Sequence, residues 1–226
     1  PESPVVQYDC ELTVRGQKRW NRIICRALWE SEEPPKMAGV IGKLVDVHDT
    51  HTRFAELEQL AFHDPLTGLL NRNYAKTQIT DQIVHHQDVS YALVIIDLDY
   101  FKDANDQYGH LFGDRVLQYM SDKLRKNIRS GDIVARVGGD EFLAFAQYVS
   151  DPELMVERIF RSLSGKYENF TISVSMGVAL TDTVGYDYTK LFHNADKALY
   201  AAKRAGRGRY CFYDSSMQDM LSVISP

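Results

Sequence analysis

The sequence predicts an α/β or α+β fold in which helices cover the faces of a central sheet. From residue 71 to residue 206, apolar runs of strand length alternate with segments whose apolar residues recur at helical spacing. The continuous run YALVIIDLD at 91–99 indicates a strand in the middle of that sheet. The glycine pair Gly138-Gly139 lies between two further apolar runs and is typical of a tight hairpin. Strands mixed with helices, with one pair joined by a hairpin, favour this fold class.

The composition is that of one large globular domain, or of a domain with a smaller piece attached. The chain has 226 residues, of which 44% are hydrophobic and 25% are charged, and its formal net charge is -5. This acidic balance argues against a nucleic-acid partner, which would require a basic surface. Three scattered cysteines without metal-ligand spacing argue against a disulfide framework and a zinc site, and they favour a reducing cytoplasm.

The hydropathy of the chain argues against a membrane-embedded segment. No apolar run approaches the roughly 18 residues that a bilayer span needs, so we expect no membrane contact within this chain and a cytoplasmic location. The chain begins with Pro1 rather than Met, which indicates a segment of a longer protein. A membrane anchor upstream of this segment is compatible with the sequence.

Residues 1–48 are predicted to be β structure. Strands are expected at 9–16, 19–30 and 39–47, with the first turn at Gly16. Three strands without a helix are too few to build a core, so we interpret this piece as part of a larger domain.

Residues 49–62 are predicted to form a connecting helix. They begin with polar residues and then place Phe54, Leu57 and Leu60 at helical spacing, with charged residues between them. The stretch HDPLTGLLNR at 63–72 ends this helix, because its proline and glycine are both turn residues.

The remaining elements follow from periodicity and from turn residues. Helices are recognised by apolar residues on one face, and strands by short apolar or alternating runs. The stretch FTISVSMGVAL alternates apolar and polar residues along its whole length and predicts one strand. The predicted helices are 71–85, 113–128, 152–163 and 188–206, and the predicted strands are 91–99, 132–137, 141–146, 170–180 and 209–214.

Carboxylates end two of the predicted strands. Asp97 and Asp99 close the central run, and the period of two along a strand predicts that their side chains share a face. Asp140 and Glu141 lie at the hairpin tip, on a neighbouring strand of the predicted sheet. Carboxylates that meet repel one another unless a cation lies between them, and Mg²⁺ binds such oxygens together with substrate phosphates. The pattern therefore favours metal-assisted phosphoryl or nucleotidyl transfer, against the simpler alternatives of a helix cap and an ordinary Gly-Gly hairpin.

Five blocks of sequence, in order, resemble the GGDEF family, the diguanylate cyclases, across residues 63 to about 213. The signature GGDEF is present at 138–142, and the other four blocks accompany it in the family's order. The resemblance implies a central, mostly antiparallel sheet flanked by helices, similar to the nucleotidyl cyclase and polymerase palm folds. It also implies that each domain binds one GTP, and that two facing domains condense two GTP into cyclic di-GMP with release of pyrophosphate. The four other blocks are HDPLTGLLNR, DLDYFKDANDQYGHLFGD, FTISVSMGV and ADKALYAAKRAGRGR.

The resemblance also implies roles for particular residues. Asp97 and Asp140 match the ligands of Mg²⁺ or Mn²⁺, two ions in each active site, with the main-chain carbonyl of Leu98 assisting. Asp140 matches the general base, or the residue that aligns the attacking 3′-hydroxyl, and Glu141 adds to metal binding and catalysis. Asn105 and Asp114 correspond to the residues that read guanine, because an amide and a carboxylate can pair with its ring N–H and exocyclic amine. The implied substrate-binding residues are Phe101, Lys102, Asn105, Asp114, Gly138, Gly139, Lys203 and Arg207.

Two further matches concern phosphate and product. Lys203 and Arg207 are four residues apart, which predicts that they share a face on the last helix or just beyond it and supply positive charge to the phosphates. Arg129 and Asp132 form an RxxD motif five residues before the signature, and the resemblance implies a product-inhibition site there, with Arg158 as its secondary part. The simpler alternative for the motif is a helix-terminal arginine followed by a capping aspartate.

Two resemblances, to the GGDEF family and to a PAS domain, together divide the chain into four predicted parts. Arg19-Trp20 matches an aromatic near the penultimate strands of a PAS sensor domain, and Asp46-Val47-His48 stands where the Asp-Ile-Thr motif usually ends that domain. Residues 1–48 therefore resemble the final strands of a PAS domain, and 49–62 would be a signalling helix that pairs with a second copy in a homodimer. Residues 63–213 form the cyclase domain, and 214–226 are a tail that ends the domain or leads to another, as a phosphodiesterase domain often follows in this family. Two alternatives remain open: a catalytically silent module that binds GTP or cyclic di-GMP, and a related nucleotidyl cyclase with another product.

Overall fold

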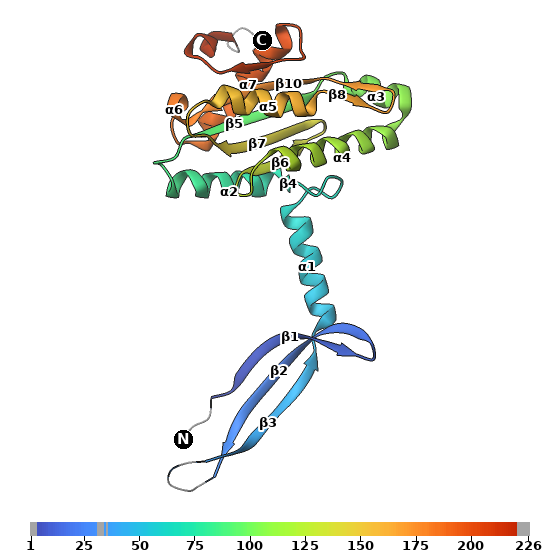
Figure 1. Cartoon of the computed structure of the whole chain (residues 1–226), viewed down its shortest axis with the longest axis vertical. Coiled ribbons are helices and arrows are strands. Elements are labelled where there is room, and N and C mark those ends of the chain that lie inside the picture. Colours follow the sequence, from blue (N-terminus) through green and yellow to red (C-terminus); the bar gives the residue numbers. More distant parts are fainter. Residues whose placement is uncertain (1–3, 31–33, 35, 221–226) are drawn as a thin grey trace. The chain divides into compact units, whose positions relative to one another are not determined.

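The computed structural model describes residues 4–30, 34 and 36–220 (Figure 1). The chain divides into two compact units, residues 1–59 and 60–226. Of the predicted tail 214–226, the last six residues lie outside the described part. None of the helices that the structure describes combines the length and the apolarity that a membrane crossing requires.

The first unit is an antiparallel meander in the order β1-β2-β3, followed by most of helix α1. Arg22 of β2 donates to the Asp9 carboxylate of β1 at 2.7 Å. His51 of α1 lies 2.9 Å from the same carboxylate and stacks on the Trp20 ring. Most apolar side chains of these strands remain exposed, so the described strands build no core of their own. The bounds are β1 (Val6–Val14), β2 (Gln17–Trp29), β3 (Met37–Asp46) and α1 (His48–Phe62).

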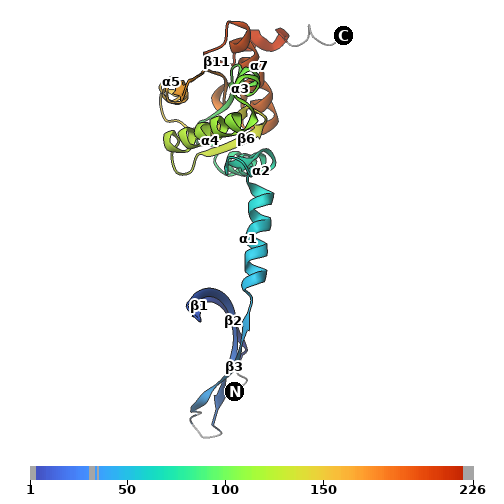
Figure 2. The ribbon, with the colours of Figure 1, turned by 90° about the vertical axis from the view of Figure 1, so that its right-hand side faces the viewer.

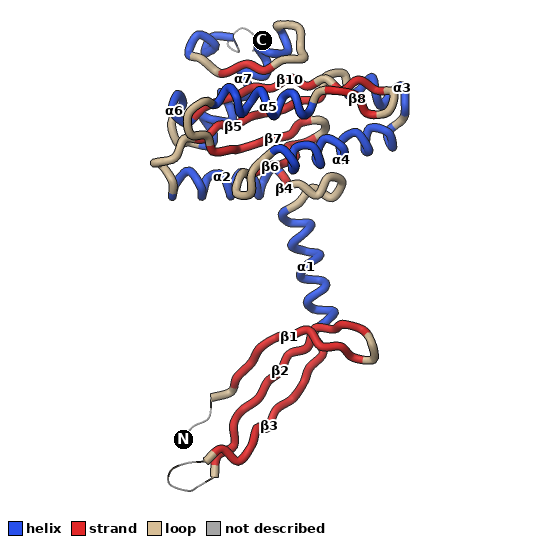
Figure 3. The backbone as a smooth tube through the Cα atoms, viewed as in Figure 1, coloured by secondary structure: helices blue, strands red, loops and turns tan. Residues whose placement is uncertain are grey.

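The second unit contains a six-stranded sheet in the order β11-β10-β5-β7-β6-β4. The three central pairings are antiparallel and the two outer ones are parallel. Figure 3 shows these strands as one layer with helices on both sides. The predicted fold class, a mostly antiparallel sheet flanked by helices, is therefore confirmed. The strands are β4 (Leu70–Asn71), β5 (Tyr91–Leu98), β6 (Ile133–Gly138), β7 (Glu141–Gln147), β10 (Val174–Leu180) and β11 (Tyr210–Phe212).

Two helices cover each face of this sheet (Figure 2). Every residue of β5 is buried, because alternate side chains of this strand pack into two separate hydrophobic cores. Val94 and Ile96 pack with α4 and α5, whereas Leu93 and Ile95 pack with α2 and α7. The covering helices are α2 (Arg72–His85), α4 (His110–Asn127), α5 (Pro152–Leu163) and α7 (Tyr188–Arg204), and the shorter elements are α3 (Phe101–Tyr108), α6 (Thr181–Val184), β8 (Gly165–Tyr167), β9 (Phe170–Ile172) and the 3-10 helix Ser215–Met220.

A glycine sets the distance between α7 and the sheet. A Cβ atom on Gly177 of β10 would overlap the main-chain carbonyl of Ala195 and the main-chain nitrogen of Leu199, both in α7. Only glycine permits this backbone-to-backbone contact. The close packing fixes α7 against the sheet and so determines where its last turn, which carries Lys203, meets the strand ends.

Two predictions of local structure were wrong. The stretch 170–180 forms two strands instead of one, since β9 pairs with β8 in a small hairpin and β10 joins the main sheet. The break falls at Ser173, whose main-chain carbonyl accepts the Asp99 N–H at 2.9 Å. A short helix, α3, was also not predicted between β5 and α4.

Candidate active site and ligand pocket

The two acidic groups singled out in the sequence meet at one end of the sheet. Asp97 of β5 lies directly opposite Glu141 of β7 in the antiparallel register. Residues that pair across antiparallel strands present their side chains on the same face, so two carboxylates stand side by side. The Leu98 N–H also donates to the Asp140 main-chain carbonyl at 3.3 Å, which joins the hairpin tip to the central strand.

The electrostatics of this corner are those of an excess of negative charge. Burial raises the pKa of Asp97, the charges of Asp140 and Asp99 raise it further, and Lys203 opposes them. Burial likewise raises the pKa of Glu141, and the Asp97 charge adds to this effect. Both carboxyl groups are thus harder to ionise than ordinary ones, because they are partly withdrawn from water and lie beside other negative charges.

Lys203 provides part of the balancing charge. Its Nζ lies 2.7 Å from Asp97 Oδ2, and its side chain is 31% exposed. The lysine belongs to the last turn of α7, where the helix dipole also favours a cation. A charge-assisted contact of this length between partly buried groups orients both side chains.

The acidic corner fits a hard divalent cation. No set of three or more His, Cys, Asp or Glu side chains in metal-binding geometry occurs in the part of the chain that the structure describes. The donors that meet are the carboxylates of Asp97 and Glu141, with Asp140 close enough to raise the pKa of both. Mg²⁺ and Mn²⁺ are commonly held by one or two carboxylates and complete their shell with water and substrate phosphate. Such an ion would stabilise the ionised form of these two adjacent carboxylates, whose pKa values are raised in its absence.

The backbone of the hairpin tip is held by an arginine of β6, which is itself paired with a carboxylate outside the hairpin. Arg136 donates from Nε and Nη2 to the Gly139 main-chain carbonyl, at 3.0 and 2.7 Å. Its Nη1 donates to the two Asp64 carboxylate oxygens at 3.1 and 3.2 Å. Gly139 has a φ of 50°, in the left-handed region where glycine is favoured. Sequence reasoning missed this link between Arg136, in a predicted strand, and Asp64, in the first of the five blocks, because nothing in the sequence relates positions so far apart.

The predicted guanine-reading residues lie where α3 meets α4. Asn105 is half-buried, and a Cβ atom on Gly113 would overlap its side-chain oxygen, so the glycine makes room for the amide. Asp114 follows Gly113 and is also half-buried. Phe101 and Lys102 open α3, with Phe101 half-buried and Lys102 exposed. Side chains from two helices therefore reach the same region, as base recognition requires.

Arg207 lies just beyond the last helix, which is one of the two positions predicted for it. Helix α7 ends at Arg204, and Arg207 follows in the left-handed region with a φ of 62°. The helical i, i+4 relation to Lys203 therefore does not apply. The guanidinium lies 5.3 Å from the centre of the Tyr100 ring, and its Nε lies 3.9 Å from Asp99 Oδ1.

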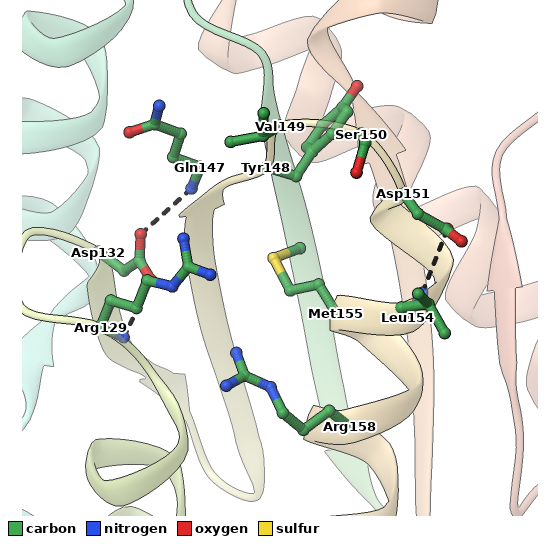
Figure 4. A pocket seen from close by; sticks show the side chains of 10 residues that line it. All are labelled: Arg129, Asp132, Gln147, Tyr148, Val149, Ser150, Asp151, Leu154, Met155 and Arg158. Carbon is green, nitrogen blue, oxygen red and sulfur yellow. Dashed lines mark hydrogen bonds between the residues drawn. The ribbon is translucent and has the colours of Figure 1, made fainter.

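The RxxD motif lies at the other end of the same hairpin. A cavity of about 340 Å³ is lined by Arg129, Asp132 and Arg158 among other residues. Figure 4 shows the two arginines approaching this cavity from different elements, Arg129 from the loop after α4 and Arg158 from α5. The Asp132 carboxylate accepts from the main-chain N–H groups of Arg129 and Gln147, each at 3.1 Å. A cavity lined by a fixed carboxylate and two exposed guanidinium groups suits a ligand with both anionic and donor atoms.

Comparison with known proteins identifies the family to which the chain is similar. A family model described as diguanylate cyclase, GGDEF domain, matches residues 61–209. MucR of Pseudomonas aeruginosa, a bifunctional diguanylate cyclase/cyclic di-GMP phosphodiesterase, is 39% identical over 75% of this chain and 26% of its own length. The cyclic di-GMP phosphodiesterase PdeR of Escherichia coli is 38% identical over 76% of this chain and 27% of its own. The diguanylate cyclase DgcS of Shewanella oneidensis is 37% identical over 70% of this chain and 55% of its own.

Solved structures agree with the family model. The GGDEF domain of TpbB (YfiN) from Pseudomonas aeruginosa has a TM-score of 0.66 at 29% identity, over 71% of this chain and 99% of that one. A microbial GGDEF domain described for its interaction with cyclic di-GMP has a TM-score of 0.62 at 33% identity, over 69% of this chain and 99% of that one. The chain spans about a quarter to a half of the length of the curated relatives named above, so what is shared is a domain. This chain belongs to the family of GGDEF, or diguanylate cyclase, domains.

Proposed function

We propose that the domain formed by residues 63–213 is an active diguanylate cyclase that condenses two GTP into cyclic di-GMP and two pyrophosphates. The observation that carries the proposal is the cross-strand pair of Asp97 and Glu141 beside Asp140, because burial first and neighbouring negative charge second raise the pKa of both paired carboxyls. A regulatory domain that only binds a nucleotide has no need of such a corner. Glycines at the tip leave the backbone open to a phosphate.

The reaction is two equivalent substitutions at phosphorus. The 3′-oxygen of each GTP attacks the α phosphorus of the other, the bond to the bridging oxygen of the pyrophosphate breaks, and the hydroxyl proton is lost. Asp140 accepts that proton, or aligns the hydroxyl while the proton passes to solvent. Bound Mg²⁺ or Mn²⁺, two ions in each site, would be held by Asp97, Asp140, Glu141 and the Leu98 carbonyl, and would lower the pKa of the attacking hydroxyl and neutralise phosphate charge.

The remaining substrate contacts follow from charge and position. Lys203, which pairs with Asp97, is placed to exchange that partner for a phosphate once a cation shields the carboxylates. Phe101 and Lys102 contribute main-chain N–H groups at the start of α3, where a helix favours anions. Asn105 and Asp114 would select guanine, because an amide and a carboxylate complement its acceptor and donor edge, whereas adenine presents the opposite pattern.

The cavity at the far end of the hairpin is proposed as the product-inhibition site. Arg129 and Arg158 would bind the phosphates or guanine edges of cyclic di-GMP, and Asp132 would accept from a guanine N–H. The likeness to a GGDEF domain described in interaction with cyclic di-GMP supports such a ligand, although it does not locate the site.

Catalysis would require a homodimer, because each domain supplies one GTP. Helix α1 exposes Phe54, Leu57 and Leu60, an apolar series that a second α1 could cover in a coiled coil. Residues 1–48 are proposed as the end of a PAS domain whose signal sets how the cyclase domains meet. With GTP as the substrate, we expect the domain to act in the cytoplasm.

A second candidate function is a silent module that binds GTP without converting it. The observation that favours it is the 38% identity to PdeR, which is named as a phosphodiesterase rather than a cyclase. Incubation of the purified protein with GTP, ATP and Mg²⁺, followed by separation of products by mass, distinguishes the candidates. Cyclic di-GMP supports the proposal, unchanged GTP supports the silent module, and an adenine-containing product would identify a different cyclase.

A further inference from the structure

Asp99 is a buried carboxylate that the proposed chemistry does not use. The residue is 2% exposed and lies just beyond β5, two positions after Asp97. Its Oδ1 accepts from the Ser175 hydroxyl at 2.7 Å. Its Oδ2 accepts from the Ser173 hydroxyl at 2.7 Å and from the Gly208 main-chain N–H at 3.0 Å. Both oxygens are therefore engaged, which leaves the group poorly suited to join Asp97 as a metal ligand.

The donors to Asp99 are neutral, so its charge must be balanced elsewhere. Arg207 is the nearest cation, with its Nε 3.9 Å from Oδ1. The side chain of Arg207 is 45% exposed, whereas that of Asp99 is fully buried, so the pair runs from the interior to the surface. A buried carboxylate beside a guanidinium restricts where that guanidinium can lie, and it leaves the outer N–H groups free to donate.

The backbone around this pair is held in an unusual conformation. Arg207 and Gly208 have φ values of 62° and 58°, and Tyr100, across from them, has 59°. Two of these three residues carry side chains, for which the left-handed region costs free energy and persists only when the surroundings impose it. The bond from the Gly208 N–H to Asp99 ties this loop to the buried carboxylate, and the guanidinium carbon of Arg207 lies 5.3 Å from the centre of the Tyr100 ring.

We propose that Asp99 is a positioning residue for the nucleotide phosphates and acts through Arg207. Its buried charge, with the Tyr100 ring, holds the loop after α7 so that the Arg207 guanidinium presents its free N–H groups to the triphosphate. The inference rests on the proposed function, because Arg207 contacts phosphate only if the domain binds GTP. The two aspartates, two residues apart, would then have different roles. Asp97 would bind a metal ion, and Asp99 would hold the Arg207 side chain in position.

A double-mutant cycle tests whether Asp99 acts through Arg207. The probe is the GTP analogue with a methylene group between the α and β phosphorus atoms, which the protein can bind with Mg²⁺ but cannot convert. We expect Asp99→Asn to weaken equilibrium binding about tenfold, the loss of one charge-assisted contact. Combined with Arg207→Ala, the same substitution should weaken binding no further. Wild-type affinity in Asp99→Asn, or a full additional loss in the double variant, would overturn the proposal.

A surface variant keeps the test decisive if Asp99→Asn fails to fold, which thermal unfolding will reveal. Tyr100→Asn removes the ring that covers the guanidinium and leaves the buried carboxylate untouched, and asparagine tolerates a positive φ. We expect binding about threefold weaker, in keeping with an exposed cation–π contact, and no such loss when Arg207 is already alanine. An equal loss with and without Arg207 would contradict the proposal. If wild-type protein binds no analogue and makes no cyclic di-GMP, the proposed function fails, whereas additive losses in an active enzyme refute only the role of Asp99.

Discussion

The β6–β7 hairpin carries carboxylates at one end and arginines around the other. At the tip, Asp140 and Glu141 crowd against Asp97 on the neighbouring strand, and Lys203 neutralises part of the charge. At the open end, Asp132 is held by two main-chain N–H groups beside an open cavity of about 340 Å³. The surplus of carboxylates at the tip favours a cation, whereas the guanidinium groups at the open end favour an anion.

The contrast indicates how one hairpin can serve both catalysis and its control. Antiparallel strands span about 3.4 Å per residue, so the five or six paired residues between the ends separate them by roughly 20 Å. A ligand at the open end therefore does not touch the reacting atoms. It would act through the strands or by changing how two domains face one another. Substitutions at the tip should therefore leave product binding unchanged, and substitutions at the open end should leave the initial rate of turnover unchanged.

The largest effect is expected at the tip. Asp140→Asn keeps the shape of the side chain but removes its charge, both as a metal ligand and as a proton acceptor. Formation of cyclic di-GMP from GTP should fall about a thousandfold, within the range for loss of a general base. Binding of cyclic di-GMP at the open end, followed by calorimetry, should not change. Undiminished turnover would remove Asp140 from the mechanism.

A smaller effect is expected at the open end. Arg129→Ala removes a guanidinium from the cavity and should raise the inhibition constant for cyclic di-GMP about a hundredfold, while the initial rate stays the same. Arg158→Ala serves as the matched control in the same cavity, and we expect a shift of about threefold to tenfold. Equal inhibition of wild type and Arg129→Ala would mean that the product binds elsewhere.

The link behind the tip should show an intermediate phenotype. Arg136→Ala frees the Gly139 carbonyl and leaves the Asp64 carboxylate without its ion pair, so we expect turnover to fall about tenfold and the free energy of unfolding to fall by about 1–3 kcal/mol. Burial works to raise the pKa of Asp64, but hydrogen bonds from Thr67 and Arg136 outweigh it and hold that pKa below its usual value. Unfolding by denaturant measures the loss of stability separately from the loss of turnover. Inhibition by product should be unchanged if the open end of the hairpin is intact. An unchanged rate would show that the tip needs no support from Arg136.

The smallest effect concerns stability and pH. The pKa of Glu141 is raised in the folded chain, so the folded state keeps this proton to higher pH than the unfolded state does, and stability is lost as the pH rises through the folded pKa. Glu141→Gln removes the like charge opposite Asp97, which is worth up to about 1 kcal/mol. Without metal, we expect the unfolding midpoint to rise by about 2–4 °C at pH 8 and the gain to vanish near pH 4. A gain of equal size at both pH values would argue against repulsion.

Much of the fold could be predicted from the sequence because local patterns determined it. The apolar run at 91–99, the Gly-Gly turn and the helical periodicities fixed the central strand, the hairpin and the covering helices. The juxtaposition of Asp97 with the tip also followed, since a carboxylate that ends a central strand meets the tip of the neighbouring hairpin.

What could not be predicted depends on contacts between distant residues. The pairing of Arg136 with Asp64 leaves no trace in local spacing. The bonds that bury Asp99, just beyond the end of β5, could not be predicted either, because they join it to Ser173 and Ser175, far along the chain. The strand breaks at Ser173, whose hydroxyl and main-chain carbonyl both bond to Asp99. A pattern of hydrophobic residues cannot predict such bonds.

We propose that this hairpin supports catalysis at its acidic end and inhibition by product at its basic end. The two roles are tested together by the time course of cyclic di-GMP formation from GTP and Mg²⁺ by wild type and Arg129→Ala, with the product identified by mass. We expect equal initial rates, after which only wild type slows as product accumulates. Absence of cyclic di-GMP from the wild-type reaction, or identical slowing of both proteins, would contradict it.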